Sequence, residues 1–247
     1  MGSQNTLLEV VNLVAQSVGH PSTVEVASSQ DEAIKRLAYY ANMACTELVY
    51  KFDWQALSKT GTIAIEGDTV AQSEKAFDLP DDFKSMTDST QWDRSTQLPA
   101  IGPVNAQDWQ WLLVRRTQVT TRFLWRIRNG KLWVKSPPPP GYPQEFSFEY
   151  KSKYWAVDGV TGDPLEMMVQ NSDYHLYPWQ LVVLFTRAKW MENEGFDATG
   201  AYNDFNTAFA YETGTDKGAT SLSLVPGIGY PYISAIRNLP DTGYGSA

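Results

Sequence analysis

The hydrophobic pattern of this chain changes its period twice, and this order constrains the fold more than any single motif does. Apolar residues recur every three or four positions over residues 7–18 and 30–50, alternate in several pieces of residues 60–156, and return to helical spacing over residues 178–211. Neither N-terminal helix can bury its apolar stripe alone, so the first and last helices are expected to pair around an inserted β unit. The sequence therefore predicts an α+β fold with three parts: a helical bundle of residues 6–58 and 173–212, an inserted antiparallel β domain of residues 59–172, and an extended C-terminal arm of residues 213–247.

Two capping boxes mark the starts of the N-terminal helices. Thr6 and Glu9 stand three positions apart, as do Ser29 and Glu32. In a capping box each side chain accepts a hydrogen bond from a backbone amide that the first helical turn leaves free. We therefore expect the two helices to begin directly after Thr6 and Ser29.

The strongest local β signal is a hairpin. Residues 124–128 and 131–135 form two β-rich runs that are separated by Asn129 and Gly130. An Asn-Gly pair supplies the two positive φ angles that a type I′ turn needs. Four prolines at residues 137–140 follow, and they predict a stiff spacer, because proline cannot donate a hydrogen bond to a neighbouring strand.

This hairpin lies in a segment whose charges all have one sign. Residues 115–135 contain seven basic side chains and no acid, with Trp125 and Trp133 among them. Arginine and aromatic side chains together are typical of surfaces that bind nucleic acid or phosphate. The alternative, which we prefer, is a basic face that meets acidic neighbours, since residues 66–93 hold eight acids. The candidate basic face comprises Arg115, Arg116, Arg122, Arg126, Arg128, Lys131 and Lys135.

The predicted helix at residues 178–193 is apolar around much of its circumference. Such a helix is buried either in the core of its own subunit or against another subunit. Trp179 and Trp190 are its largest side chains, and tryptophan is common at the centres of interfaces. We therefore treat Trp179 and Trp190 as candidate contacts with another subunit.

The last 35 residues have an unusual composition. Residues 213–247 are rich in glycine and proline, hold only four charges, and show no helical or alternating period. A disordered, solvated tail would be more charged and less apolar. We therefore expect an arm that becomes ordered on a partner. Its candidate contact residues are Leu222, Leu224, Val225, Ile228, Tyr230 and Tyr232.

Motifs of catalysis and metal binding are missing from the sequence. It contains no phosphate-binding loop, GxSxG, HExxH or CxxC pattern, so no catalytic residue, metal site or cofactor is predicted. Nine tryptophans and the pair Asp81-Asp82 leave two alternatives open. These are a carbohydrate-binding β module and a glycan hydrolase that uses Asp81 or Asp82.

Cysteine usage and hydropathy indicate the compartment. The single cysteine, Cys45, lies in a helical apolar pattern, so it predicts a small buried side chain and excludes an intramolecular disulfide. The N-terminal stretch has the wrong pattern for a signal peptide, and no run approaches the ~18 apolar residues of a membrane span. We expect a protein that is assembled in a reducing cytosol and has no membrane partner.

Several motifs in order resemble the head-to-tail adaptor proteins of tailed bacteriophages, the class that includes tail tubular protein A. These motifs are residues 79–83 (LPDDF), residues 125–133 (WRIRNGKLW) with the proline run after them, residues 148–155 (FEYKSKYW), and residues 187–190 (RAKW). The resemblance covers about residues 6–212. One departure is residues 52–55 (FDWQ), where the family pattern is closer to Gly-Trp-x-Phe-Asn.

The resemblance implies a structural role. Such adaptors are helical bundles that bear a β insertion, and they carry no catalytic residues. They form a ring of twelve at the head–tail junction of the virion, between the portal protein and a tail nozzle or tail tube protein, after assembly in the host cytoplasm. DNA passes through the channel of the ring without sequence-specific binding.

Overall fold

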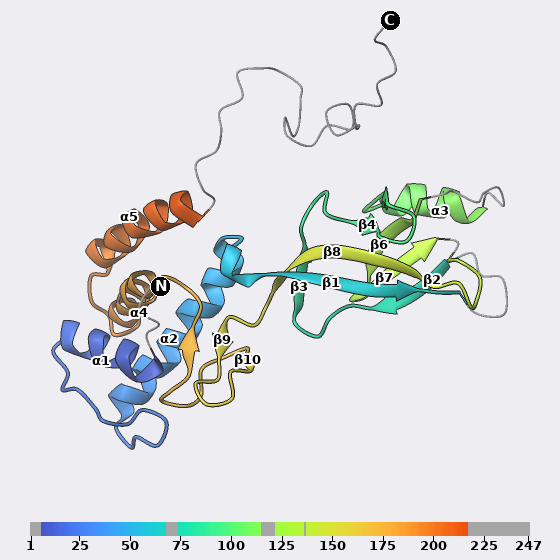
Figure 1. Cartoon of the computed structure of the whole chain (residues 1–247). Helices are drawn as coiled ribbons and strands as arrows, with labels where there is room; N and C mark the ends of the chain where they lie inside the picture. The colour runs from blue at the N-terminus through green and yellow to red at the C-terminus, as the bar shows by residue number, and fades with distance from the viewer. Residues whose placement is uncertain (1–5, 68–73, 115–121, 136, 217–247) are drawn as a thin grey trace, which may run out of the picture.

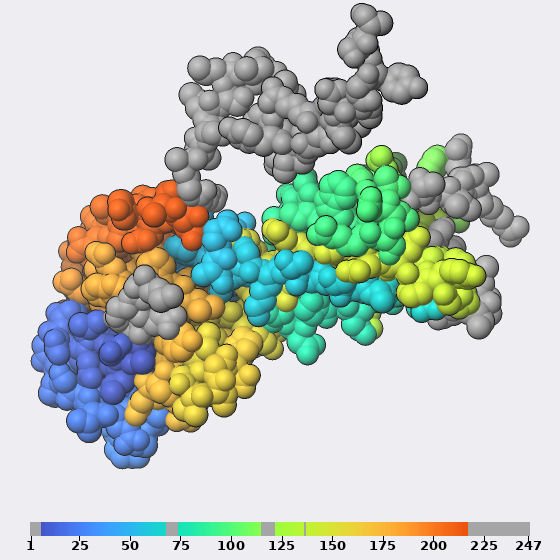
Figure 2. Space-filling view, viewed as in Figure 1, coloured from blue at the N-terminus to red at the C-terminus, as the bar shows by residue number. Residues whose placement is uncertain are grey.

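The computed structural model describes residues 6–67, 74–114, 122–135 and 137–216, which form two lobes (Figure 1). One lobe contains the N- and C-terminal helices packed together, and the other contains antiparallel sheets. The space-filling view shows the two lobes beside each other, with the start of β1 (Ser58–Ile65) between them (Figure 2). This arrangement confirms the predicted α+β fold with an inserted β unit. The predicted arm started too early, because residues 213–216 continue the last helix of the structure, which ends at Asp216. Residues 217–247 of the predicted arm lie outside the described residues.

Four long helices make up the helical lobe: α1 (Leu7–Ser17), α2 (Glu32–Lys51), α4 (Trp179–Asn193) and α5 (Thr199–Asp216). Helix α4 lies in the centre and contacts α1, α2 and α5. Contacts with helices of the same subunit therefore explain why α4 is apolar around so much of its circumference. The buried apolar side chains of α4 are Leu181, Val182, Phe185, Ala188 and Trp190.

The two predicted capping boxes have different outcomes. The Thr6 amide donates to Glu9 Oε2 (2.9 Å) and the Glu9 amide to Thr6 Oγ1 (3.3 Å), which confirms the first box. The second is wrong, because Asp31 caps α2 by accepting from the Ala33 amide at 3.0 Å. Ser29 instead accepts from the Asp31 amide at 3.2 Å and so fixes the capping residue itself.

Strand β8 (Gln144–Ser152) is the centre of the larger sheet in the β lobe. It pairs antiparallel with all of β1, from Ser58 opposite Lys151 to Ile65 opposite Gln144. Its other edge pairs with two short strands, and a third continues the sheet beyond them. These three strands are β3 (Phe83–Met86), β4 (Trp92–Asp93) and β5 (Leu98–Pro99).

A three-stranded sheet packs against this sheet and contains the predicted hairpin. Its order is β2 (Glu74–Asp78), β7 (Lys131–Lys135) and β6 (Leu124–Arg128). Asn129 (φ 53°) and Gly130 (φ 69°) turn the chain between β6 and β7, as a type I′ hairpin requires. The core of the lobe consists of Ile65, Phe123, Trp125, Leu132, Val134, Phe146, Phe148 and Tyr150.

The chain between β8 and α4 belongs to the core of the helices. It contains a small sheet of β9 (Ala156–Val157), β10 (Pro164–Leu165) and β11 (Tyr174–His175). Trp155, Ala156 and Met168 lie in the same hydrophobic cluster as α1, α2 and α4. The exact division of the chain into domains stays a prediction, and this packing indicates that residues 155–172 unfold with the helices.

The carboxylate of Asp82 connects three segments at the boundary between the lobes. Asp82 is 8% exposed. It accepts hydrogen bonds from Lys59 Nζ of β1 (2.6 Å), the Tyr150 hydroxyl of β8 (2.8 Å) and the Ser152 hydroxyl of β8 (2.8 Å). A buried carboxylate is tolerated only with such partners, because the loss of its hydration must be offset.

A second charged group, Lys151 of β8, ties the same boundary to the end of α2. Its ammonium donates to the carbonyl oxygens of Asp53 (3.3 Å) and Trp54 (3.1 Å) and to the Ser58 hydroxyl. These acceptors lie around the short 3-10 helix η1 (Gln55–Leu57), between α2 and β1. We call the Asp82 and Lys151 networks together the joint.

The joint predicts a large loss of stability when Asp82 is removed. Asp82→Ala should lower the free energy of unfolding by about 3 kcal/mol, because the buried hydroxyls of Tyr150 and Ser152 would lose their acceptor. Urea denaturation followed by tryptophan fluorescence measures this. The neighbouring Asp81 is exposed, so Asp81→Ala is the matched control and should change stability by less than about 0.5 kcal/mol. Equal effects of the two substitutions on stability would contradict the claim that the hydrogen bonds of Asp82 stabilise the joint.

The same carboxylate should make stability depend on pH in the acid range. Burial raises the pKa of Asp82, but hydrogen bonds from Lys59, Tyr150 and Ser152 outweigh burial and leave the pKa below its usual value. A lowered folded-state pKa stabilises the protein above the unfolded value of about 3.9, and this contribution is lost as pH falls through the folded pKa. The stability difference between wild type and Asp82→Ala should therefore shrink below about pH 4.

Candidate functional site

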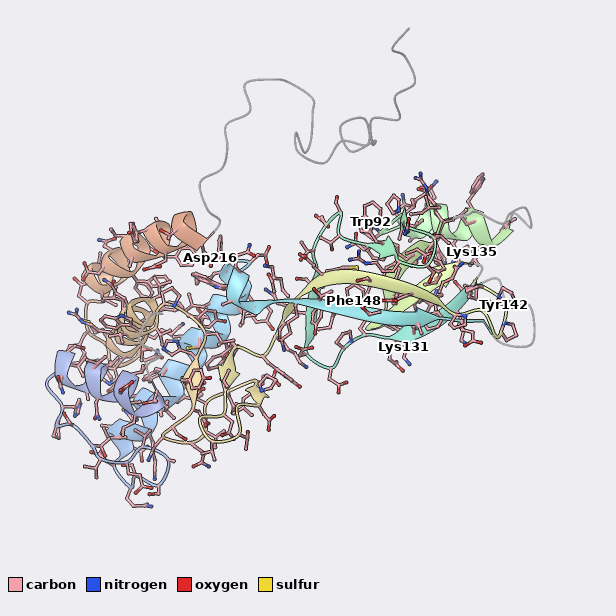
Figure 3. The ribbon with its side chains drawn as sticks, viewed as in Figure 1. Trp92, Lys131, Lys135, Tyr142, Phe148 and Asp216 are labelled. Atoms are coloured by element: carbon pink, nitrogen blue, oxygen red, sulfur yellow. The ribbon has the colours of Figure 1, made fainter. Side chains whose placement is uncertain are left out.

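The basic residues of the predicted hairpin lie on the outer face of the three-stranded sheet. Side chains alternate along each strand, and the inward set of Trp125, Leu132 and Val134 is buried. The outward set includes two cross-strand pairs, Arg126 opposite Trp133 and Arg128 opposite Lys131. Figure 3 shows Lys131 and Lys135 on the β lobe, away from the helical lobe. We call this outer surface of β2, β7 and β6 the basic face.

Two acids of β2 pair with cations of the basic face. Arg128 Nη2 lies 3.7 Å from Glu74 Oε1, and Lys131 Nζ lies 2.7 Å from Asp78 Oδ1. Both acids belong to the acidic segment of residues 66–93. The Lys131–Asp78 pair is exposed, and such pairs contribute only about 0–1 kcal/mol to stability, whereas the Arg128–Glu74 pair is half-buried. Their main effect here is to lower the positive potential of the face.

Aromatic rings hold the two arginines of β6. The Arg128 guanidinium lies 3.8 Å from the centroid of Trp133, and the Arg126 guanidinium lies 5.6 Å from that of Trp109. Trp109 is fully buried, and its indole nitrogen donates to Glu74 Oε2 at 2.6 Å. Arginine stacked on tryptophan is attracted to the negative face of the ring. The stacking and pairing hold both guanidinium groups close to the sheet.

The sequence analysis missed the helix that carries Trp109. Helix α3 (Ala106–Val114) begins after Asn105, whose side-chain oxygen accepts from the Asp108 amide at 2.8 Å. The Asn105 amide group donates back to the Asp108 carboxylate at 2.7 Å. An Asn-x-x-Asp pair of this kind is a helix-start signal, and it would have revealed α3 inside the β unit.

The remaining candidate basic residues have varied positions. Arg115 and Arg116 lie outside the described residues, Arg122 is exposed, and Lys135 is half-buried opposite Glu74. The structure therefore brings four of the seven candidate cations together on one sheet, namely Arg126, Arg128, Lys131 and Lys135.

The two candidate tryptophans of α4 differ in exposure. Trp179 is 43% exposed at the start of the helix, whereas Trp190 is 9% exposed. Trp190 stacks on Phe196 at a centroid distance of 5.5 Å and meets the edge of His20 at 5.9 Å. Trp190 thus packs within its own subunit, and Trp179 is the one available to a partner. The six candidate residues of the arm, from Leu222 to Tyr232, lie outside the described residues.

The carboxylates of the alternative hydrolase interpretation do not form an acid–base pair. Asp82 is buried in the joint, where Lys59, Tyr150 and Ser152 occupy its oxygens, while Asp81 is exposed. A glycosidase needs two carboxyl groups that face one substrate. Asp82 is therefore a structural carboxylate, and it is not placed to act with Asp81 as a second carboxyl group.

Other reactive side chains are also buried. Cys45 has no exposed surface, as predicted, and burial raises the pKa of its thiol. Burial lowers the pKa of His175 to about 4, so this residue is neutral at pH 7.

Within the described residues, no group of three or more His, Cys, Asp or Glu side chains is arranged to hold a metal ion. None of the described helices is long and apolar enough to span a membrane.

Comparison with known proteins adds the family. No curated protein matches the sequence. The family described as SU10 adaptor protein matches residues 5–241, a range that includes both lobes and continues past the end of α5. The chain therefore belongs to the SU10 adaptor protein family of phage head-to-tail adaptors, which are structural and non-enzymatic proteins.

Proposed function

We propose that this adaptor forms a ring of twelve identical subunits at the head–tail junction of a virion. The ring lies between the portal protein and a tail nozzle or tail tube protein, and DNA passes through its channel. The observation that carries this proposal is the family match, because it spans both lobes and reaches residue 241.

The contacts of the ring are proposed from exposed apolar side chains. Trp179 is 43% exposed on α4, and tryptophan is enriched in the cores of protein interfaces. The predicted arm beyond α5, residues 217–247, supplies a second apolar segment, with Leu222, Leu224, Val225, Ile228, Tyr230 and Tyr232 as its candidate contacts. We propose that both take part in contacts with the portal or the adjacent adaptor.

Electrostatics supports a channel that lets DNA slide. The net charge of the chain is −8, and residues 155–216 hold ten acids and two bases. The cations of the basic face are partly neutralised by Glu74 and Asp78. A surface of this kind makes few phosphate contacts, and phosphate contacts account for most non-specific DNA affinity. The passing duplex would therefore not be held by sequence-specific or strong backbone contacts.

In vitro complementation tests the proposed role. Particles assembled without this chain should be DNA-filled heads that lack tails, because nothing would join the portal to the tail. Adding the purified full-length chain together with tail proteins should restore tail attachment, scored by electron microscopy. Trp179→Ala should restore it less well than wild type at the same concentration. Tails attached normally in the absence of the chain would refute the proposal.

The basic face should bind duplex DNA only weakly. Non-specific binding should have a Kd above about 1 μM at physiological salt, and Arg126→Ala with Arg128→Ala should weaken it only slightly, because both arginines are stacked on tryptophans. Fluorescence anisotropy with a labelled duplex measures the affinity. Lys35→Ala with Arg36→Ala, two exposed cations of α2, removes the same charge elsewhere. A sub-micromolar affinity that only the β6 double variant abolishes would show that this face grips DNA.

A further inference from the structure

A groove on the outside of the helical lobe has the chemistry of a docking site. It lies between α4 and α5 and has a volume of about 490 Å³. Its apolar part is formed by Leu184, Ala208 and Tyr211, and its acidic part by Asp204 and Glu212. No basic residue is among the described side chains that line it. We call it the α4–α5 groove.

The groove is a surface feature above a well-packed pair of helices. Phe185 of α4 and Phe205 of α5 stack beneath it, with ring centroids 4.2 Å apart and an interplanar angle of 12°. The two helices therefore need no further side chain to complete their contact. Tyr211 on the rim nevertheless remains 72% exposed, although burial of an aromatic ring is favourable. A partner that covered Tyr211 would gain this burial.

The lining specifies an occupant that is apolar and carries a positive charge. The segment of residues 233–239 (ISAIRNL) has this pattern, with Arg237 among Ile233, Ile236 and Leu239. Beyond Asp216 the sequence holds only two cations, Lys217 and Arg237, and Arg237 is the one with an apolar side chain within two positions on each side, Ile236 and Leu239. Opposite charges on the two surfaces fix the register of an apolar contact and favour one partner over others.

The start of the arm is fixed in space. Asp216 at the end of α5 accepts a hydrogen bond from the Gln55 amide at 2.9 Å, next to the start of β1 (Figure 3). Residues 233–239 follow 17 to 23 positions later. An extended chain of this length reaches roughly 55–80 Å, which is enough to cross an adjacent subunit. A contact passed from each subunit to the next in one direction closes into a ring.

We propose that the α4–α5 groove binds residues 233–239 of a neighbouring copy of this chain, with Arg237 against the acidic side chains of Asp204 and Glu212. This inference rests on the proposed function, because the ring brings the two copies together. Each subunit then gives an arm to one neighbour and receives an arm from the other. The arm thereby links adaptor to adaptor, and the contact with the portal is left to other surfaces.

Site-directed cross-linking of the full-length chain tests this contact. Cys45 is fully buried and does not compete for a maleimide. Chains with Thr207→Cys in the groove and chains with Ile236→Cys in the arm carry different tags and are mixed, either free or bound to tail-less heads. A short bismaleimide should join the two tagged chains. Asn206→Cys is the matched control, since residue 206 is exposed and points about 100° away around the same helix.

Exchanging the charges of the two surfaces tests whether Arg237 is recognised by Asp204 and Glu212. Arg237→Glu should lower the yield of the Thr207–Ile236 product at least about fivefold, because like charges would face each other. Combining Arg237→Glu with Asp204→Lys and Glu212→Lys should restore the yield. Further substitutions would not rescue a variant whose yield fell because it misfolds, so restoration of the yield excludes misfolding as the cause of the loss.

Three outcomes would overturn the inference. In the first, Asn206→Cys and Thr207→Cys give equal yields of cross-linked product. In the second, a chain that carries both cysteines cross-links only within itself. In the third, Ile236→Cys cross-links to another virion protein instead of to this chain. Failure of the inference and failure of the proposed function are distinguishable. If tails attach but the cross-link does not form, the groove contact is refuted and the proposed function is retained. If the cross-link forms but tails do not attach, the proposed function is refuted and the groove contact is retained.

Discussion

The joint between the lobes is the constraint on which the rest of the architecture depends. The β lobe is reached through β1 and left through β8, and these paired strands meet the helices where Asp82 and Lys151 are buried. Buried charges are costly unless every oxygen and N–H is satisfied. Here the carboxylate of Asp82 has three donors and the ammonium of Lys151 has three acceptors. The bonds of Lys151 reach the segment between α2 and β1 and so set the angle at which β8 leaves the helices, whereas the bonds of Asp82 hold β1, β8 and the turn before β3 together.

Aromatic residues complete this connection on the helical side. Trp54, 2% exposed, donates its indole N–H to the Leu48 carbonyl at 2.9 Å and packs edge-on against Phe52, Tyr177 and Phe209. Phe209 belongs to α5, so the ring of Trp54 links the last helix to the segment from which β1 begins. The end of α5 is thus positioned by the same segment that positions the β lobe. In the proposed ring, the origin of the C-terminal arm is fixed relative to both lobes.

Much of the fold follows from local rules that the sequence displays directly. The helical period, the Thr6–Glu9 capping box and the Asn129-Gly130 turn all predicted elements that the structure contains. The wrong predictions arose where two possible capping residues stood close together or where an element was too short to show its period. Asp31 replaced Ser29 as the cap of α2, and α3, only nine residues long, was absorbed into the predicted β unit.

The surfaces were harder to predict because they depend on tertiary neighbours. The sequence showed the excess of cations around the hairpin but not that β2 would place Glu74 and Asp78 on the same sheet. It also showed that α4 is apolar all round, but the choice between a core and an interface depended on α1, α2 and α5 surrounding it. Trp179 and Trp190 could not be distinguished by sequence, since the burial of Trp190 depends on its contacts with His20 and Phe196.

Cryo-electron microscopy of the intact virion tests the central claim most directly. The account predicts that density for this chain forms a closed ring of twelve copies between the portal and the tail, with both lobes held at the angle that the joint specifies. Density for the chain at another site in the particle, or as isolated copies that do not close into a ring, would contradict it.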